Sequence, residues 1–155
     1  TRENLILNGG LDTDTVWAKG TGWTIASGKG TKAAGTASAI GQPLAAQAGK
    51  YYRVYFELSG ATASTITPRL TGGTTRNGTA RNANGSFSDR IQAVTGNATF
   101  ELSATSTFVG SVDNVGVYLE TTTCLAQGVH YIWLEPQNDQ GVPGPVAGPF
   151  TVTIK

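Results

Sequence analysis

Four side chains with binding chemistry stand at alternating positions near the middle of the chain. Tyr51, Arg53, Tyr55 and Glu57 are separated by single residues, so in a strand they would share one face of a sheet. Aromatic rings stack on the apolar side of a pyranose, and the charged pair can bond to its hydroxyls. The spacing therefore predicts a sugar-binding platform. The same residue types also pack against a neighbouring subunit or form a plain solvated surface, and both alternatives stay open.

Three side chains outside this stretch carry similar chemistry. Trp17 lies just before a glycine-rich segment and is predicted to be a stacking residue on a loop. Arg76 and Arg81 fall within residues 71–85, which are rich in Gly, Asn, Thr and Arg and contain almost nothing to bury. This composition predicts a long polar loop, and such loops on rigid scaffolds often carry binding sites. A mobile turn that binds nothing is the alternative.

No recognisable catalytic arrangement is present. Hydrolysis of a glycoside needs two carboxyl groups across a cleft, and the ten Asp and Glu residues form no pair in a known motif. A serine-type triad would need the single histidine, His130, which lies in the C-terminal segment. Cys124 is the single cysteine and is predicted to be a half-buried, unreactive residue. We therefore expect a protein that is not an enzyme.

Charge and hydropathy argue against two classes of partner. The formal net charge is +1, and the arginines are scattered along the chain, which does not favour nucleic acid or an anionic membrane surface. No apolar run approaches the ~20 residues of a membrane-spanning helix. The first residues lack the pattern of a signal peptide. We expect neither nucleic-acid binding nor membrane insertion.

The elements that would hold these side chains are predicted to be short strands. Only 14% of the residues are charged, which favours strands and turns over long exposed helices. Trp23 shares its parity with Ile25, so it is predicted to lie in the core. Spacing and punctuation by glycine predict strands within residues 4–12, 22–25, 37–42, 50–58, 64–70, 87–94, 98–103 and 111–120. Short strands at this regular spacing indicate an all-β sandwich or barrel over residues 1–120.

The chain changes character after residue 120. Residues 121–123 predict a link, and residues 130–134 and 150–154 predict two strands joined by a proline-rich loop. This resembles the last hairpin of an immunoglobulin-like or fibronectin-like domain without the strands before it. Because a lone hairpin is marginal in water, it must dock on the first domain, a partner subunit or another protein, and a partner is favoured. We predict that residues 121–155 form an attachment or oligomerisation segment.

Three stretches together resemble one family. They are Asn-Gly-Gly-Leu-Asp (8–12) with the Gly-Trp pair (22–23), Ala-Gly-Lys-Tyr-Tyr-Arg-Val-Tyr-Phe (48–56), and Phe-Val-Gly-Ser-Val-Asp-Asn-Val-Gly-Val (108–117). They are similar to the opening, central and closing strands of jelly-roll carbohydrate-binding modules that accompany glycanases. Similar domains occur in bacteriophage tail and fibre proteins. The resemblance implies an antiparallel jelly-roll β-sandwich over residues 1–120, followed by the C-terminal hairpin.

The same resemblance implies a structural Ca²⁺ ion. In this family a calcium ion often ties the first strand to the last, and the matching carboxylates here are Asp12 and Asp113. Backbone carbonyls near Asn8 and Gly28 would add ligands, since Ca²⁺ takes six to eight oxygens. The alternative is that Asp12 caps a turn and Asp113 accepts a backbone hydrogen bond in a bulge.

These observations lead to one functional hypothesis and one alternative. The leading hypothesis is a non-catalytic phage virion protein, a decoration, fibre or tail component. It would associate with itself or with other virion proteins and aid attachment to host-surface glycans. The tail segment, with Trp-Leu-Glu-Pro-Gln-Asn (133–138), resembles phage structural proteins, which favours this hypothesis. The alternative is an extracellular carbohydrate-binding module of a bacterial glycanase or surface protein.

Overall fold

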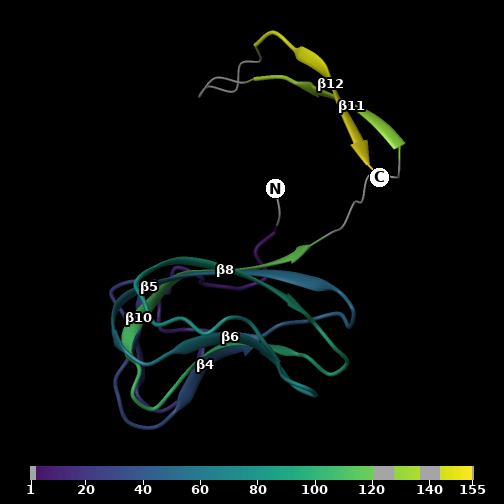
Figure 1. Cartoon of the computed structure of the whole chain (residues 1–155). Coiled ribbons are helices and arrows are strands. Elements are labelled where there is room, and N and C mark those ends of the chain that lie inside the picture. The colour runs from purple at the N-terminus through teal and green to yellow at the C-terminus, as the bar shows by residue number, and fades with distance from the viewer. Residues whose placement is uncertain (1–2, 121–127, 137–143, 155) are drawn as a thin grey trace. The chain divides into compact units, whose positions relative to one another are not determined.

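The computed structural model describes residues 3–120, 128–136 and 144–154. The chain forms two compact units, Thr1–Thr121 and Thr122–Lys155 (Figure 1). The link at 121–123 and Cys124 lie outside the described residues, so the predictions made for them stay predictions. No helix in the described part of the chain is long and apolar enough to cross a membrane.

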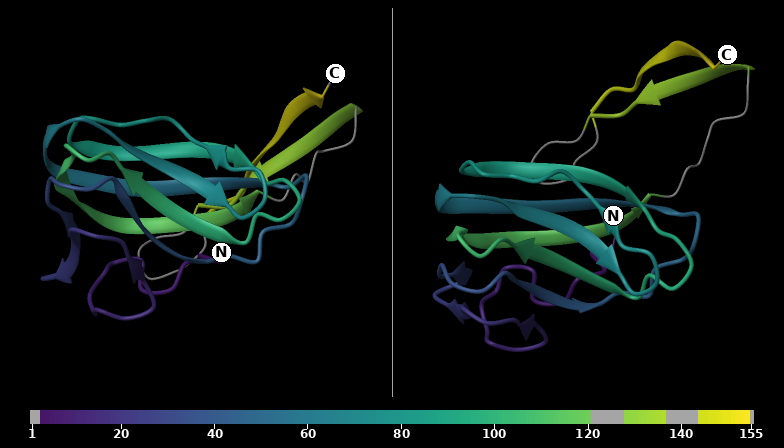
Figure 2. Two further views of the ribbon diagram at one scale, coloured as in Figure 1. Left: turned by 90° about the horizontal axis from the view of Figure 1, so that it is seen from below. Right: turned by 60° about the horizontal axis from the view of Figure 1, so that its bottom comes forward.

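The first unit is a β-sandwich of two five-stranded antiparallel sheets, which confirms the predicted fold class. Figure 2 shows its strands in two layers. In spatial order, the first sheet is β1 (Ala18–Lys19), β4 (Ser38–Pro43), β9 (Thr99–Ala104), β6 (Ile66–Thr71) and β7 (Arg76–Asn77). The second sheet is β2 (Trp23–Ala26), β3 (Lys29–Lys32), β10 (Val109–Glu120), β5 (Tyr51–Ala63) and β8 (Gly85–Gln92). Whether this strand order is that of a jelly roll stays a prediction.

Strand β5 shows how the sequence pattern builds the sandwich. Its buried residues alternate with half-buried ones, as predicted: Tyr52, Val54, Phe56 and Leu58 point into the core. Facing strands of both sheets supply the rest of the core, including Ile40, Ile66, Leu70, Phe100, Leu102 and Val112. Burial of a side chain as large as Phe or Leu contributes about 1.5–3 kcal/mol, so this alternation fixes which face of β5 looks outward.

The N-terminal segment differs from its prediction, because residues 4–12 form no strand. They lie beside β10 in an irregular conformation: Leu5 N donates to Val117 O, and Val115 N donates to Gly9 O. The left-handed backbone of Asn8, with φ 49°, turns the chain before a regular ladder can form. The side chain of Gln42 completes the fit, since its amide bonds to both Leu7 N and Leu7 O. The segment therefore closes the sandwich without being a strand.

The second unit contains the predicted hairpin, β11 (Gly128–Leu134) paired antiparallel with β12 (Ala147–Ile154). Both strands are longer than predicted. Its large apolar side chains are exposed, although the rings of Tyr131 and Trp133 contact each other at 6.4 Å between centroids. The exposed residues are Val129, Tyr131, Ile132, Trp133, Leu134, Val146 and Phe150. Within this unit, the described residues therefore provide no buried core.

Candidate functional site

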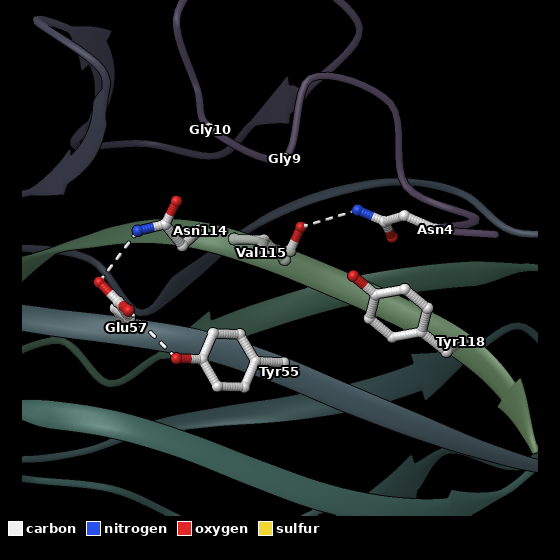
Figure 3. A pocket seen from close by; sticks show the side chains of 8 residues that line it. All are labelled: Asn4, Gly9, Gly10, Tyr55, Glu57, Asn114, Val115 and Tyr118. Carbon is white, nitrogen blue, oxygen red and sulfur yellow. Dashed lines mark hydrogen bonds between the residues drawn. The ribbon is translucent and has the colours of Figure 1, made fainter. Parts of the chain in front are cut away.

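A groove of about 380 Å³ lies on the outer face of β5 and β10. Figure 3 shows its lining, with two tyrosine rings on one side and the N-terminal loop on the other. Its lining residues come from three segments: Tyr55 and Glu57 from β5, Asn114, Val115 and Tyr118 from β10, and Asn4, Gly9 and Gly10 from the N-terminal segment. Two of them, Tyr55 and Glu57, belong to the platform predicted from sequence.

A β-bulge brings Asn114 into the groove. The register between β10 and β5 shifts between Asp113 and Gly116, where the two residues Asn114 and Val115 on β10 stand opposite Phe56 alone on β5. Asn114 adopts a left-handed backbone, with φ 48°, which Asn tolerates better than most residues. Its Nδ2 donates to Glu57 Oε2 over 3.0 Å. Bulges commonly re-aim a side chain in this way.

Gly116 lets the ring of Tyr118 lie across the sheet. A Cβ atom at position 116 would stand 2.7 Å from Cε2 of Tyr118 and 3.0 Å from its hydroxyl. Any side chain there would therefore push the ring away. Gly116 pairs with Tyr55 on β5, and Tyr118 pairs with Arg53 two residues further along. The two tyrosines therefore occupy neighbouring positions on the same face of the paired strands.

Glu57 is the polar centre of the groove. Its Oε1 accepts hydrogen bonds from the Tyr55 hydroxyl at 3.1 Å and the Ser86 hydroxyl at 3.3 Å, in addition to the Asn114 bond on Oε2. The hydrogen bond from Asn114, followed by that from Tyr55, lowers the pKa of the Glu57 carboxyl below its usual value, although burial opposes the shift. The groove therefore holds an ionised carboxylate that faces partly toward solvent.

The opposite wall depends on close backbone contact. The Cβ of any residue other than glycine at position 9 would collide with the Val115 carbonyl oxygen, so the N-terminal loop can approach β10 only at Gly9. Asn4 secures the same wall, because its Nδ2 donates to Val115 O and its Oδ1 accepts from Val117 N. The Gly-Gly pair thus has a role in shaping the groove.

The other half of the predicted platform forms a separate charged cluster. Glu120 accepts from Arg53 at 2.7 Å and from Arg90 at 2.6 Å. The Arg90 guanidinium also lies 3.5 Å from the centre of the Tyr51 ring. The hydrogen bond from Arg90, with that from Arg53, lowers the pKa of Glu120. Tyr51 and Arg53 share the outer face with Tyr55 and Glu57 but do not line the groove.

Trp17 is a core residue, which corrects the prediction of a stacking ring on a loop. It is 6% exposed, and its indole N–H donates to Asn8 O over 3.0 Å. Burial satisfies its large apolar surface while the turn accepts its single donor. Trp23, at 5% exposed, lies in the core as predicted.

The segment 71–85 is more structured than the predicted loop. It contains the short strand β7, and Arg81 forms an isolated bridge with Ile66. The Arg81 guanidinium donates to buried Asp89 at 2.8 Å and stacks on Phe87. Arg76 is exposed and donates to the Gln92 carbonyl oxygen. Neither arginine lines the groove, and Arg81 holds its own segment onto β8.

The two predicted calcium ligands have different surroundings. Asp113 Oδ1 accepts from the backbone N–H of Asn114 in the bulge, as the alternative reading expected. The Asp12 carboxylate lies near Gly10, in the N-terminal turn, and near Gly28, in the turn between β2 and β3. Within residues 3–120, 128–136 and 144–154, no group of three or more His, Cys, Asp or Glu side chains is placed to hold a metal. The calcium site at Asp12 and Asp113, with added backbone carbonyls, stays a prediction.

A second depression, of about 360 Å³, lies on the outer face of β1, β4 and β9. Its lining includes small residues such as Ala39 and Gly41, and the charged residues Lys19 and Glu101. No aromatic residue is among those that line it. It therefore lacks the stacking surface that distinguishes the groove.

Six of the groove residues were not predicted from the sequence as ligand-binding candidates: Asn4, Gly9, Gly10, Asn114, Val115 and Tyr118. The alternation of residues 114–119 already puts Tyr118 on the outward face of its strand, which is the signal that could have found it. Known proteins add nothing further here: neither the models of known protein families nor the curated proteins contain a match to this chain.

Proposed function

We propose that the sandwich is a non-catalytic glycan-binding domain whose ligand occupies the groove between β5, β10 and the N-terminal loop. The observation that carries the proposal is the pair of half-buried tyrosines, Tyr55 on β5 and Tyr118 on β10, at neighbouring positions on the outer face of these paired strands. Tyrosine rings stack on pyranoses. Around them stand Glu57, Asn114 and Asn4, whose side chains can bond to hydroxyls.

The polar groups of the groove support the proposal of binding without catalysis. Glu57 is the one carboxyl group among its lining residues, whereas the usual glycosidases use a pair. A lowered pKa also makes Glu57 a poor proton donor near neutral pH, because a general acid needs a raised pKa. The groove is suited to holding a sugar rather than to cleaving one.

The proposal extends to the whole chain through the hairpin. The exposed apolar side chains of β11 and β12 suit an attachment segment, so we place the protein in a larger assembly such as a phage virion. A jelly-roll strand order and a calcium ion near Asp12 and Asp113 belong to this proposal. The alternative is an extracellular carbohydrate-binding module, for which the same groove would serve.

Affinity electrophoresis and calorimetry on a panel of plant and bacterial glycans test the proposal. At least one glycan should bind, and Tyr118→Ala or Tyr55→Ala should weaken binding roughly threefold to tenfold through the loss of a stacking ring. Tyr51→Ala is the matched control, because Tyr51 shares the strand and face of Tyr55 but lies outside the groove.

Two results would count against the groove as the glycan-binding site. One is the absence of binding to every glycan on the panel. The other is a Tyr51→Ala protein that loses binding while both groove variants retain it, which would favour the platform as predicted from the sequence.

A further inference from the structure

The charges around the groove are unevenly distributed. Among its lining residues, Glu57 is the one that is ionised at neutral pH, and none is basic. The hydrogen bonds that Glu57 accepts come from neutral donors, Asn114, Tyr55 and Ser86. Neutral donors orient a carboxylate without cancelling its charge. The groove therefore presents a net negative charge to its ligand.

The neighbouring cations do not neutralise Glu57 by direct contact. Lys29 is the basic residue with an electrostatic effect on Glu57, and this effect is the smallest of those that shift its pKa. The Lys29 ammonium donates to Ser59 Oγ at 3.3 Å. Arg53, next along the outer face from Tyr55, is paired with Glu120. Both cations are engaged elsewhere.

The remaining acceptors of the groove lie close together. A carboxylate has about four lone-pair sites, and three hydrogen bonds to Glu57 leave about one for a ligand. Asn114 donates through Nδ2, so its carbonyl oxygen is left as an acceptor. The faces of Tyr55 and Tyr118 add electron-rich surface, which attracts a cation. A protonated primary amine, with three donors and a positive charge, matches this set.

We propose that the groove selects glycans that carry a free amino group, such as glucosamine oligosaccharides, over their neutral N-acetylated and acidic counterparts. This inference rests on the proposed glycan binding and adds the class of sugar. The amine would donate to Glu57 and Asn114 while the sugar ring stacks on a tyrosine. An acidic sugar would meet the charge of Glu57 and be repelled.

Competition between two glycans of the same length and linkage tests the inference. Calorimetry would compare glucosamine oligosaccharides with N-acetylglucosamine oligosaccharides on the full chain at low salt. An exposed ion pair strengthened by a ring contact should favour the amine about fivefold to tenfold. The preference should shrink in 1 M salt, where the Debye length is about 3 Å.

Two variants test whether the charge of Glu57 causes the preference for the amino sugar. Glu57→Gln keeps the shape of the side chain but removes its charge, so it should bring the two affinities to within about twofold of each other. Asp14→Asn is the matched control: Asp14 pairs with Lys19 and does not line the groove, so the preference should persist. Thermal melts would verify that both variants are folded.

Different outcomes of these measurements would overturn the amine selectivity and the proposed glycan binding. Equal affinities, or a preference for the acetylated chain, would overturn the amine selectivity and leave glycan binding intact. Binding of oligolysine as tight as that of the glucosamine chain would overturn it as well, because the amine alone would then suffice. No binding to either chain or to any neutral glycan would overturn the proposed function itself.

Discussion

Two glycines shape the groove because they have no side chain, and other residues shape it through the groups that they contribute. Gly116 provides no functional group, yet the ring of Tyr118 occupies the space that a side chain would fill. Gly9 acts in the same way for the N-terminal loop. Asn114 meets two requirements at one position: it adopts a left-handed backbone, and its side-chain amide donates to Glu57.

Substitution of Gly116 tests whether the Tyr118 ring must lie in its observed position, because the ring stays in the chain but is displaced. We expect Gly116→Ala to weaken glycan binding about as much as Tyr118→Ala, roughly threefold to tenfold, because the Cβ displaces the ring. The free energy of unfolding should change by less than about 1 kcal/mol. Alanine loses less backbone entropy than glycine on folding, and this gain offsets part of the strain from the displaced ring. Calorimetry and denaturant titration measure the two effects. Unchanged binding would mean that the ring is not positioned by Gly116.

At the level of elements, the charged cluster ties three strands of one sheet together. Glu120 ends β10, and its partners Arg53 and Arg90 stand on β5 and β8. Surface ion pairs contribute little individually, but Glu120 is mostly buried, at 13% side-chain exposure, and is held from two sides. The cluster therefore fixes the end of the sandwich next to the groove.

The pH dependence of stability tests the cluster. The pKa of Glu120 is lower in the folded chain than the usual value of 4.5, so the cluster contributes stability above that pH and loses it as pH falls through the folded pKa. We expect Glu120→Gln to lower Tm by about 1–4 °C at pH 7. The difference should disappear toward pH 2. A difference that persists undiminished in acid would contradict an ionic origin.

The sequence predicted the elements better than it predicted the site. Strict alternation in β5 puts Tyr55 and Glu57 on the outer face, because a strand has only two faces to choose between. The position of Trp17 depends instead on one hydrogen bond to Asn8 O across an irregular turn. Likewise, Asn4 reaches β10 across more than a hundred residues of chain. Local patterns carry no information about such distant partners.

On the scale of the whole molecule, one chain joins a well-packed sandwich to a hairpin with exposed apolar side chains. Such surface on a two-stranded element is costly in water and favours association. We expect the full chain to self-associate at micromolar concentration and Ile132→Asp to reduce this association. Sedimentation velocity measures it. A monomeric wild-type chain across that range would rule out self-attachment through the hairpin.

A glycan held in the groove between β5, β10 and the N-terminal loop would change the surroundings of the backbone there. Backbone amide shifts of the labelled chain, followed by NMR during titration with a glycan that binds, test this binding site most directly. We expect the largest shifts at Gly10, Tyr55, Glu57, Asn114 and Tyr118, with little change in the other sheet. Shifts concentrated at Ala39, Gly41 and Glu101, around the second depression, would contradict this binding site.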